Sequence, residues 1–118
     1  MAYVQAASAA ASPLESGLSD LISLSRQRRV LVAARDVDVG ELARLDALLR
    51  QSLGALRRQS DSLPASIALD VSALNTDWQV LESAHPGLQS TPFARFAQHS
   101  QFIDNQLALL SHVREVGL

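Results

Sequence analysis

The stretch Leu21-Ile-Ser-Leu-Ser-Arg-Gln-Arg-Arg-Val-Leu-Val32 lies in the first strongly periodic segment of the chain. Its aliphatic side chains recur at helical spacing, which predicts a single apolar stripe along a helix. Ser25 falls near the middle of that stripe, and Arg28 and Arg29 flank it on opposite sides. A buried arginine needs a negative partner. The segment therefore predicts one polar layer beside the apolar stripe of this helix.

Length and composition indicate one domain that neither inserts directly into a membrane nor binds nucleic acid in general. The chain has 118 residues, of which 47% are hydrophobic and only 4% aromatic, so aliphatic side chains must form the core. A net charge of -2 disfavours general nucleic-acid binding, and the absence of cysteine excludes disulfides, thiolate catalysis and cysteine-based zinc sites. No apolar run approaches the ~18 residues of a spanning helix, so no membrane insertion is expected.

No signal peptide is visible at the N-terminus of the sequence. We expect a cytoplasmic protein if the chain is complete, and a periplasmic one if it is an excised sensor domain.

Capping sequences divide the chain into helices. The start signals are Ser12-Pro-Leu-Glu15, Asp38-Val-Gly-Glu41 and Thr91-Pro92. The third helix is expected to begin with Asp70 or Ser72 as its cap, and His85-Pro-Gly87 is expected to stop it. The predicted helices are about 13–35, 39–59, 70–84 and 92–116. Short connections between them predict an all-α, up-down-up-down antiparallel four-helix bundle. Residues 1–11 are expected to form a flexible or frayed segment, and residues 12–118 a single domain.

Each predicted helix carries an apolar stripe that defines the expected core. The first stripe comprises Leu14, Leu18, Leu21, Ile22, Leu24 and Val32. The second comprises Leu42, Leu45, Leu48, Leu49, Leu53 and Leu56, and the third Val71, Leu74, Trp78 and Leu81. The fourth is a broader arc of Phe93, Phe96, Phe102, Ile103, Leu107, Leu109, Leu110 and Val113, which predicts contact with two neighbouring helices.

The sequence disfavours catalysis. The three histidines lack metal-ligand spacing, and Glu82 with His85 forms the only Glu-x-x-His pair, whereas a di-iron bundle needs two. No glycine-rich phosphate loop or Gly-x-Ser-x-Gly motif is present. His99 and His112 lie on a predicted helix, but neither is followed by the small, glycine-bearing pattern of a phosphotransfer histidine. We therefore expect a protein that is not an enzyme, with no metal and no cofactor.

Polar residues within apolar stripes are the candidate site. His99 and Gln106 fall near the middle of the arc of the last helix. In the expected topology, Arg29 and His99 each lie on the order of 10 Å from the end shared by the first and last helices. A layer of Ser25, Arg28, Arg29, His99 and Gln106 is thus predicted as a candidate ligand-binding site.

Two interpretations of this layer remain open. It can form a pocket for a small anion or another small molecule. Alternatively, the arginines reach solvent and His99 is an ordinary core or edge histidine. A carboxylate can also neutralise a buried arginine without any ligand, and the candidates are Glu41, Asp46, Asp104 and Glu115.

Three segments carry a resemblance to a known family. They are Leu24-Ser-Arg-Gln-Arg-Arg-Val-Leu-Val-Ala33, then Leu63-Pro64 followed by Leu74-x-x-x-Trp78-x-x-Leu81, and finally Phe96-x-x-His99-x-x-Phe102-Ile103-x-x-x-Leu107-x-Leu109-Leu110-x-x-Val113. Together they resemble bacterial four-helix-bundle sensor domains of the nitrate/nitrite-sensing type, which occur in chemoreceptors, sensor kinases and diguanylate cyclases. The resemblance covers about residues 18–116. It implies a non-enzymatic signalling module in which Arg28, Arg29 and His99 line the ligand. Val30 and Val32 replace the usual glycine and serine of the first segment, which implies a fuller pocket.

A second segment resembles another class of protein. Ala34-Arg-Asp-Val-Asp-Val-Gly-Glu-Leu-Ala-Arg-Leu-Asp46-x-x-Leu-Arg50 is similar to the junction between the first two helices of small flagellar and type III export chaperones. That resemblance implies an apolar groove that receives a client helix. The expected partners are therefore a small anion or other small ligand, a helical protein, or a second copy of the chain in a homodimer.

Overall fold

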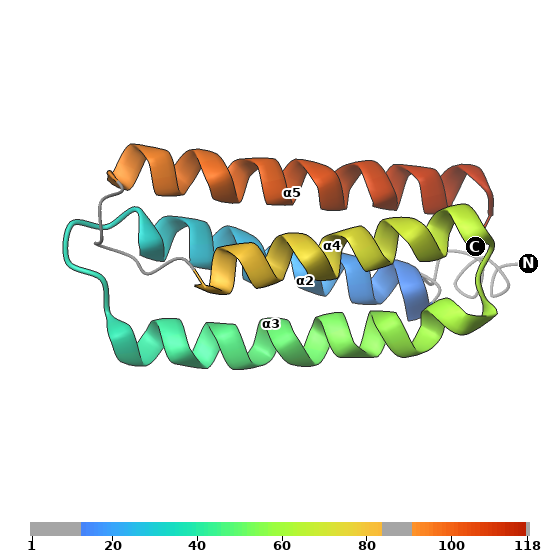
Figure 1. The fold of residues 1–118 in the computed structure, drawn as a ribbon, viewed down its shortest axis with the longest axis horizontal. Coiled ribbons are helices and arrows are strands. Elements are labelled where there is room, and N and C mark those ends of the chain that lie inside the picture. Colours follow the sequence, from blue (N-terminus) through green and yellow to red (C-terminus); the bar gives the residue numbers. More distant parts are fainter. Residues whose placement is uncertain (1–12, 84–90, 118) are drawn as a thin grey trace, which may run out of the picture.

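The computed structural model describes residues 13–83 and 91–117. This part of the chain contains four α-helices and one short 3-10 helix: α2 (Pro13–Val32), α3 (Val39–Gln59), η1 (Ser60–Ser62), α4 (Ala65–Ser83) and α5 (Pro92–Glu115). Successive helices run antiparallel in a bundle (Figure 1), so the predicted fold class is confirmed. The predicted N-terminal segment 1–11, the Ser12 cap and the 85–87 stop signal lie outside the described residues.

Two helix starts lie where their capping residues predicted them. The side chain of Asp38 accepts a hydrogen bond from the backbone N–H of Glu41 at 3.1 Å, which caps α3. The Thr91 hydroxyl accepts from the backbone N–H of Ala94 at 3.0 Å, and Pro92 occupies the first turn of α5. These bonds satisfy donors that have no partner within the helix, which is why both boundaries could be predicted.

The boundaries of two other helices differ from the prediction. α4 begins at Ala65, not at Asp70, because Pro64 holds Leu63 in an extended conformation (φ −102°, ψ 157°) and then accepts the first helical hydrogen bond from Ala68. The extra turn places Ile67 in the core, where it is fully buried. The first helix was predicted to reach residue 35, but α2 ends at Val32.

The core lies between all four helices. α2 packs against α3 and α5, and α4 closes the bundle against the same two neighbours. Trp78 and Phe102 stack with their ring centroids 6.2 Å apart, near the middle of the bundle. Each large apolar side chain buried in this way contributes about 1.5–3 kcal/mol. Within the described residues, no helix is both long enough and apolar enough to cross a membrane.

The buried face of α5 is narrower and more polar than predicted. Phe93, Phe96 and Leu107 were predicted to lie in its apolar arc, but they are 80%, 39% and 38% exposed. They lie toward the edge of the helix, whereas Arg95, His99 and Gln106 occupy the buried face alongside the aliphatic side chains. The interface of α5 with α2 therefore contains a polar layer.

Candidate functional site

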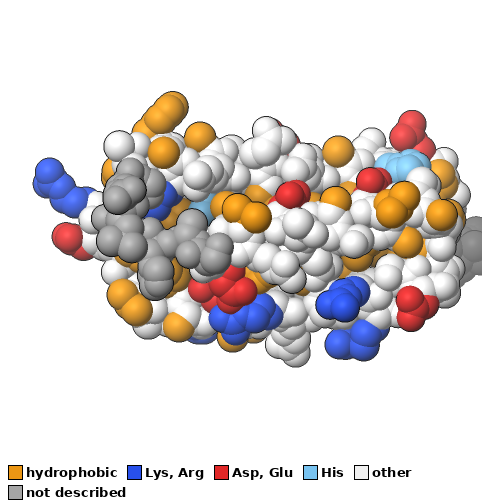
Figure 2. Space-filling model, viewed as in Figure 1, with side chains coloured by type: hydrophobic (Ala, Val, Ile, Leu, Met, Phe, Trp, Pro, Cys, Tyr) orange, Lys and Arg blue, Asp and Glu red, His pale blue; other side chains and the backbone are white. Residues whose placement is uncertain are grey.

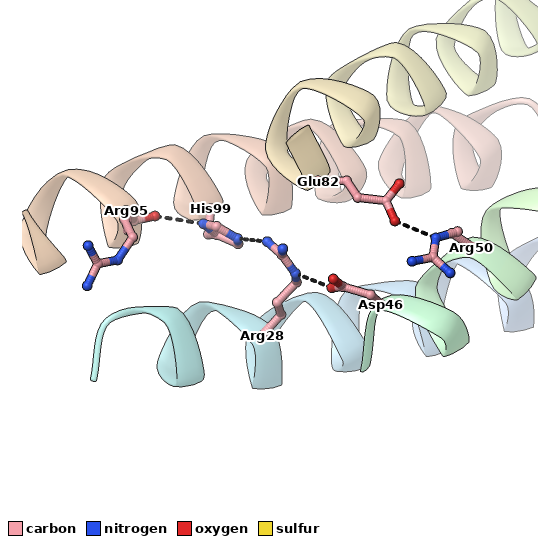
Figure 3. A network of polar contacts seen from close by, with 6 residues as sticks. All are labelled: Arg28, Asp46, Arg50, Glu82, Arg95 and His99. Carbon is pink, nitrogen blue, oxygen red and sulfur yellow. Dashed lines mark hydrogen bonds and ion pairs between the residues drawn. The ribbon is translucent and has the colours of Figure 1, made fainter. Parts of the chain in front are cut away.

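Arg28 lies at the centre of this polar layer. Its side chain is only 2% exposed, and its Nε donates a hydrogen bond to Oδ1 of Asp46 at 2.6 Å. A terminal nitrogen of the same guanidinium is hydrogen-bonded to Nε2 of His99 (Figure 3). The guanidinium carbon also lies 4.9 Å from the ring centroid of Trp78. Asp46 of α3 thus compensates the charge of Arg28, while His99 of α5 and Trp78 of α4 complete the contacts of its guanidinium.

The contacts of His99 define its protonation. Its Nδ1 lies 2.7 Å from the backbone carbonyl oxygen of Arg95, which can only accept, so Nδ1 carries the proton and Nε2 accepts from Arg28. Burial, above all, and the nearby charge of Arg28 lower the pKa of His99 to about 4, although the hydrogen bond to the Arg95 carbonyl acts to raise it. The imidazole is therefore neutral at pH 7.

Arg95 is a buried residue of the layer that was not predicted from the sequence. It is 7% exposed, and its Nε donates to the backbone carbonyl of Val32 at 2.6 Å. That carbonyl belongs to the last turn of α2, where carbonyls lack partners within the helix. Arg95 precedes His99 by one helical turn, so the same helical-wheel reasoning that selected His99 would have placed Arg95 on the buried face.

Ser25 and Gln106 form a second, uncharged pair. The side chains are 1% and 0% exposed. Nε2 of Gln106 donates to the Ser25 hydroxyl at 2.9 Å, and the hydroxyl donates to Oε1 of Gln106 at 3.3 Å. The two residues satisfy each other and link α2 to α5.

Removing only one member of this neutral pair should be costly. We expect Ser25→Ala to destabilise the protein by about 1–3 kcal/mol, because the buried amide of Gln106 then loses its partner. The double variant Ser25→Ala with Gln106→Leu should recover much of that loss, because no buried polar group is left without a partner. Urea unfolding of both variants measures the difference. A double variant that is less stable than Ser25→Ala would show that Gln106 makes stabilising contacts with groups other than Ser25.

Arg29 is held differently from Arg28. Its side chain is partly buried, and one terminal nitrogen of its guanidinium donates a hydrogen bond to the Ser100 hydroxyl at 3.1 Å. The guanidinium carbon lies 4.7 Å from the ring centroid of Phe96. No carboxylate within residues 13–83 or 91–117 forms an ion pair with it. Its buried Nε also has no hydrogen-bond partner. Within the described residues, no carboxylate therefore compensates the charge of Arg29.

The structure thus places the predicted site residues in three groups. Ser25 pairs with Gln106, Arg28 pairs with His99, and Arg29 lies beside the layer at the outer edge of α2 and α5. Among the four candidate carboxylates, Asp46 is the partner of Arg28. Glu41 pairs instead with Arg44 on the surface. In the described part of the chain, no three histidine, aspartate or glutamate side chains lie close enough to hold a metal ion.

Comparison of the chain with protein-family models, with curated proteins and with solved structures gives no match. The resemblances to sensor domains and to export chaperones therefore stay predictions. The arrangement of the polar layer is the ground on which a function can be argued.

Proposed function

We propose that this protein is a non-enzymatic helical-bundle module of the sensor or signalling type that binds a small anion at Arg29. The observation that carries the proposal is the uncompensated charge of Arg29, together with its buried Nε, which lacks a hydrogen-bond partner in the described structure. Burying a charged group without a partner is unfavourable, so an anion that supplies the missing acceptor and the missing charge gains affinity from both.

Arg29 is a better candidate for anion binding than Arg28. An anion at Arg28 would have to displace the carboxylate of Asp46, which is only 13% exposed and already bonded. At Arg29 the contacts seen within the described residues are the Ser100 hydroxyl and the face of the Phe96 ring, and neither carries a negative charge. A guanidinium offers a planar fork of N–H donors, which matches planar oxyanions such as nitrate, nitrite and carboxylates.

Binding at Arg29 would couple ligand to helix position. Arg29 belongs to α2, whereas Ser100 and Phe96 belong to α5, so an anion at this point contacts both helices. A ligand shifts a conformational equilibrium only by its difference in affinity between the states. An anion shared by α2 and α5 favours the arrangement in which the two helices approach as they do here, which is how a sensor bundle can transmit a signal.

The proposal predicts stabilisation by a small planar anion. At constant ionic strength, nitrate, nitrite or a short carboxylate should raise the melting temperature relative to chloride. A ligand at a hundred times its dissociation constant adds about 2.7 kcal/mol to the stability of the native state. Arg29→Gln should abolish this anion-specific rise, because it removes the charge.

A matched control is available on the same helix. Arg26→Gln removes an exposed arginine of α2 and should leave the anion-specific rise intact. If none of these anions stabilises the protein above chloride, or if Arg29→Gln keeps the full effect, the proposal is wrong.

A second candidate function is supported by a groove between α4 and α5. This groove has a volume of about 270 Å³, and the apolar side chains Val80, Leu81 and Phe102 line it together with neutral and acidic polar residues. A groove of this size accommodates apolar side chains from one face of a client helix, as an export-chaperone-like protein requires. Native mass spectrometry of the purified protein separates the two functions, because a chaperone would carry a bound polypeptide and would not respond to the anion.

A further inference from the structure

α4 has two apolar faces, of which one lies outside the core. Its buried face comprises Ile67, Val71, Leu74, Trp78 and Leu81. Its opposite face carries Leu69, Ala73, Thr76 and Val80, which we call the outer ridge; Leu69 is 70% and Val80 64% exposed. The spacing of four, three and four residues in this ridge is the a/d spacing of a helix that packs along another helix. Figure 2 views the side on which α4 lies and shows hydrophobic side chains exposed on it.

Charges of opposite sign flank the outer ridge. On the side of α5 lies an acidic edge of Asp70 and Asp77, whose carboxylates contact His112 at 3.5 Å and the Asn105 amide at 3.1 Å. In the described part of the chain, neither carboxylate pairs with an arginine. On the side of α3 lies a basic edge formed by Arg57 and Arg58. In the right half of Figure 2, the blue side chains lie below the middle of this face with red beside them, and further red side chains lie above it.

The arginines of the basic edge have no carboxylate partner in the described residues. They line a groove of about 690 Å³ between α3 and α4, which also contains Asp61, Ser72 and Thr76. Even with the charge of Asp61 included, this edge is net positive. Farther along the same side, Arg50 and Glu82 neutralise each other.

The two edges lie at the same height along α4. Ser72 and Thr76 line the groove with Arg57 and Arg58, and both fall between Asp70 and Asp77 in the sequence of α4. A second copy that faces the first, and is related to it by a two-fold axis parallel to α4, keeps each residue at its own height and exchanges the two edges. The acidic edge of each copy then lies opposite the basic edge of the other.

We infer that the outer ridge of α4 is the interface of a two-fold homodimer in which the two α4 helices run parallel. Leu69 and Val80 of each copy lose their exposure to water in this arrangement, and the small Ala73 and Thr76 let the helices approach closely. A two-fold axis perpendicular to α4 would instead make the helices antiparallel and place the acidic edges against each other. Like charges in contact disfavour that alternative.

Sedimentation velocity of the full chain tests the interface. The wild-type protein should form a dimer, and Leu69→Arg should convert it to a monomer, because a charge replaces the largest apolar group of the ridge. Val39→Arg is the matched control, since Val39 is 75% exposed at the start of α3, away from the ridge, and should leave the dimer intact. A wild-type chain that stays monomeric, or that associates with another protein instead, would overturn the proposal, as would a Leu69→Arg dimer of unchanged affinity.

Charge exchange tests the orientation. Replacing both arginines of the basic edge by glutamate should weaken the dimer, and so should replacing Asp70 and Asp77 by arginine. The variant that combines all four changes should regain wild-type affinity, because opposite charges face each other again. In an antiparallel dimer each edge would face its own counterpart, so like charges would meet in the wild type and in all of these variants. Neither exchange alone would then weaken the dimer selectively, and the combined variant would show no rescue. Failure of that rescue contradicts the parallel arrangement.

A disulfide tests the orientation independently. The natural chain has no cysteine, so Leu69→Cys introduces a single thiol. In the parallel dimer the two thiols lie side by side and should oxidise to a covalent dimer. In an antiparallel dimer residue 69 would face Val80 of the partner subunit, about 16 Å along the helix from its own counterpart, so no such bond could form.

Discussion

Arg28→Met is expected to destabilise the protein by about 3–5 kcal/mol, the largest loss that we predict for a single substitution in the layer. Methionine fills much of the same volume but leaves the carboxylate of Asp46, which is 13% exposed, without its counter-charge. It also leaves Nε2 of His99 without a donor. Urea unfolding measures the loss as a change in the free energy of unfolding.

The same substitution at an exposed ion pair serves as the control. Arg44 pairs with Glu41 on the surface of α3, where the side chains are 55% and 41% exposed. Arg44→Met should leave the free energy of unfolding nearly unchanged, because solvent screens such pairs. Adding Asp46→Leu to Arg28→Met should recover part of the larger loss, since the uncompensated charge is then absent. Equal losses for Arg28→Met and Arg44→Met would contradict the buried ion pair.

Acid should destabilise the protein through His99, in a pH window that its shifted pKa defines. The pKa of His99 is lowered from 6.5 to about 4 in the folded protein, so as the pH falls the unfolded chain binds the proton first. The contribution of neutral His99 to the free energy of unfolding is therefore complete above about pH 6.5, and it is lost progressively as the pH falls to about 4. Within this window the free energy of unfolding should fall by about 1.4 kcal/mol per pH unit, to a total loss of about 3 kcal/mol.

Two histidine variants identify the residue responsible. The amide of glutamine can donate to the carbonyl of Arg95 and accept from Arg28, as the neutral imidazole does, but it does not titrate. His99→Gln should therefore remove most of the loss between about pH 6.5 and 4. His112→Gln is the matched control, because His112 contacts Asp70 of α4 and takes no part in the contacts of His99. Urea unfolding curves recorded across this pH range measure the difference. If His99→Gln loses as much stability in acid as the wild type does, His99 is not the source of the loss.

The helices of this protein could be predicted where local chemistry defines them. Asp38 and Thr91 supply capping oxygens, so the starts of α3 and α5 were evident in the sequence. The start of α4 was missed because Asp70 and Ser72 resemble caps, whereas Pro64 sets the true boundary through the backbone of its neighbours. The exposure of Phe93 depends on how α5 rotates against α2, which is a property of the packed bundle and not of the helix alone.

The polar layer could be predicted only in outline. The helical wheel placed Ser25, His99 and Gln106 on buried faces, and the structure shows them buried. The helical wheel could not select Asp46 over the three other carboxylates, because that choice depends on how far α3 is displaced along its axis relative to α2. Nor could it separate Arg28 from Arg29, because they occupy adjacent positions. Within the described residues, Arg28 is the one of the two that contacts a carboxylate.

The protonation of His99 tests the central claim that Asp46 and His99 occupy the hydrogen-bond donors of Arg28. Nitrogen-15 NMR of the imidazole ring should show a neutral ring at pH 7 with its proton on Nδ1, and titration should give a pKa of about 4. The assignment of anion binding to Arg29 depends on that result, because it treats the guanidinium of Arg28 as occupied by Asp46 and His99. A ring with its proton on Nε2 and a pKa near the unperturbed value of about 6.5 would show that Arg28 does not donate to it, and would contradict this account.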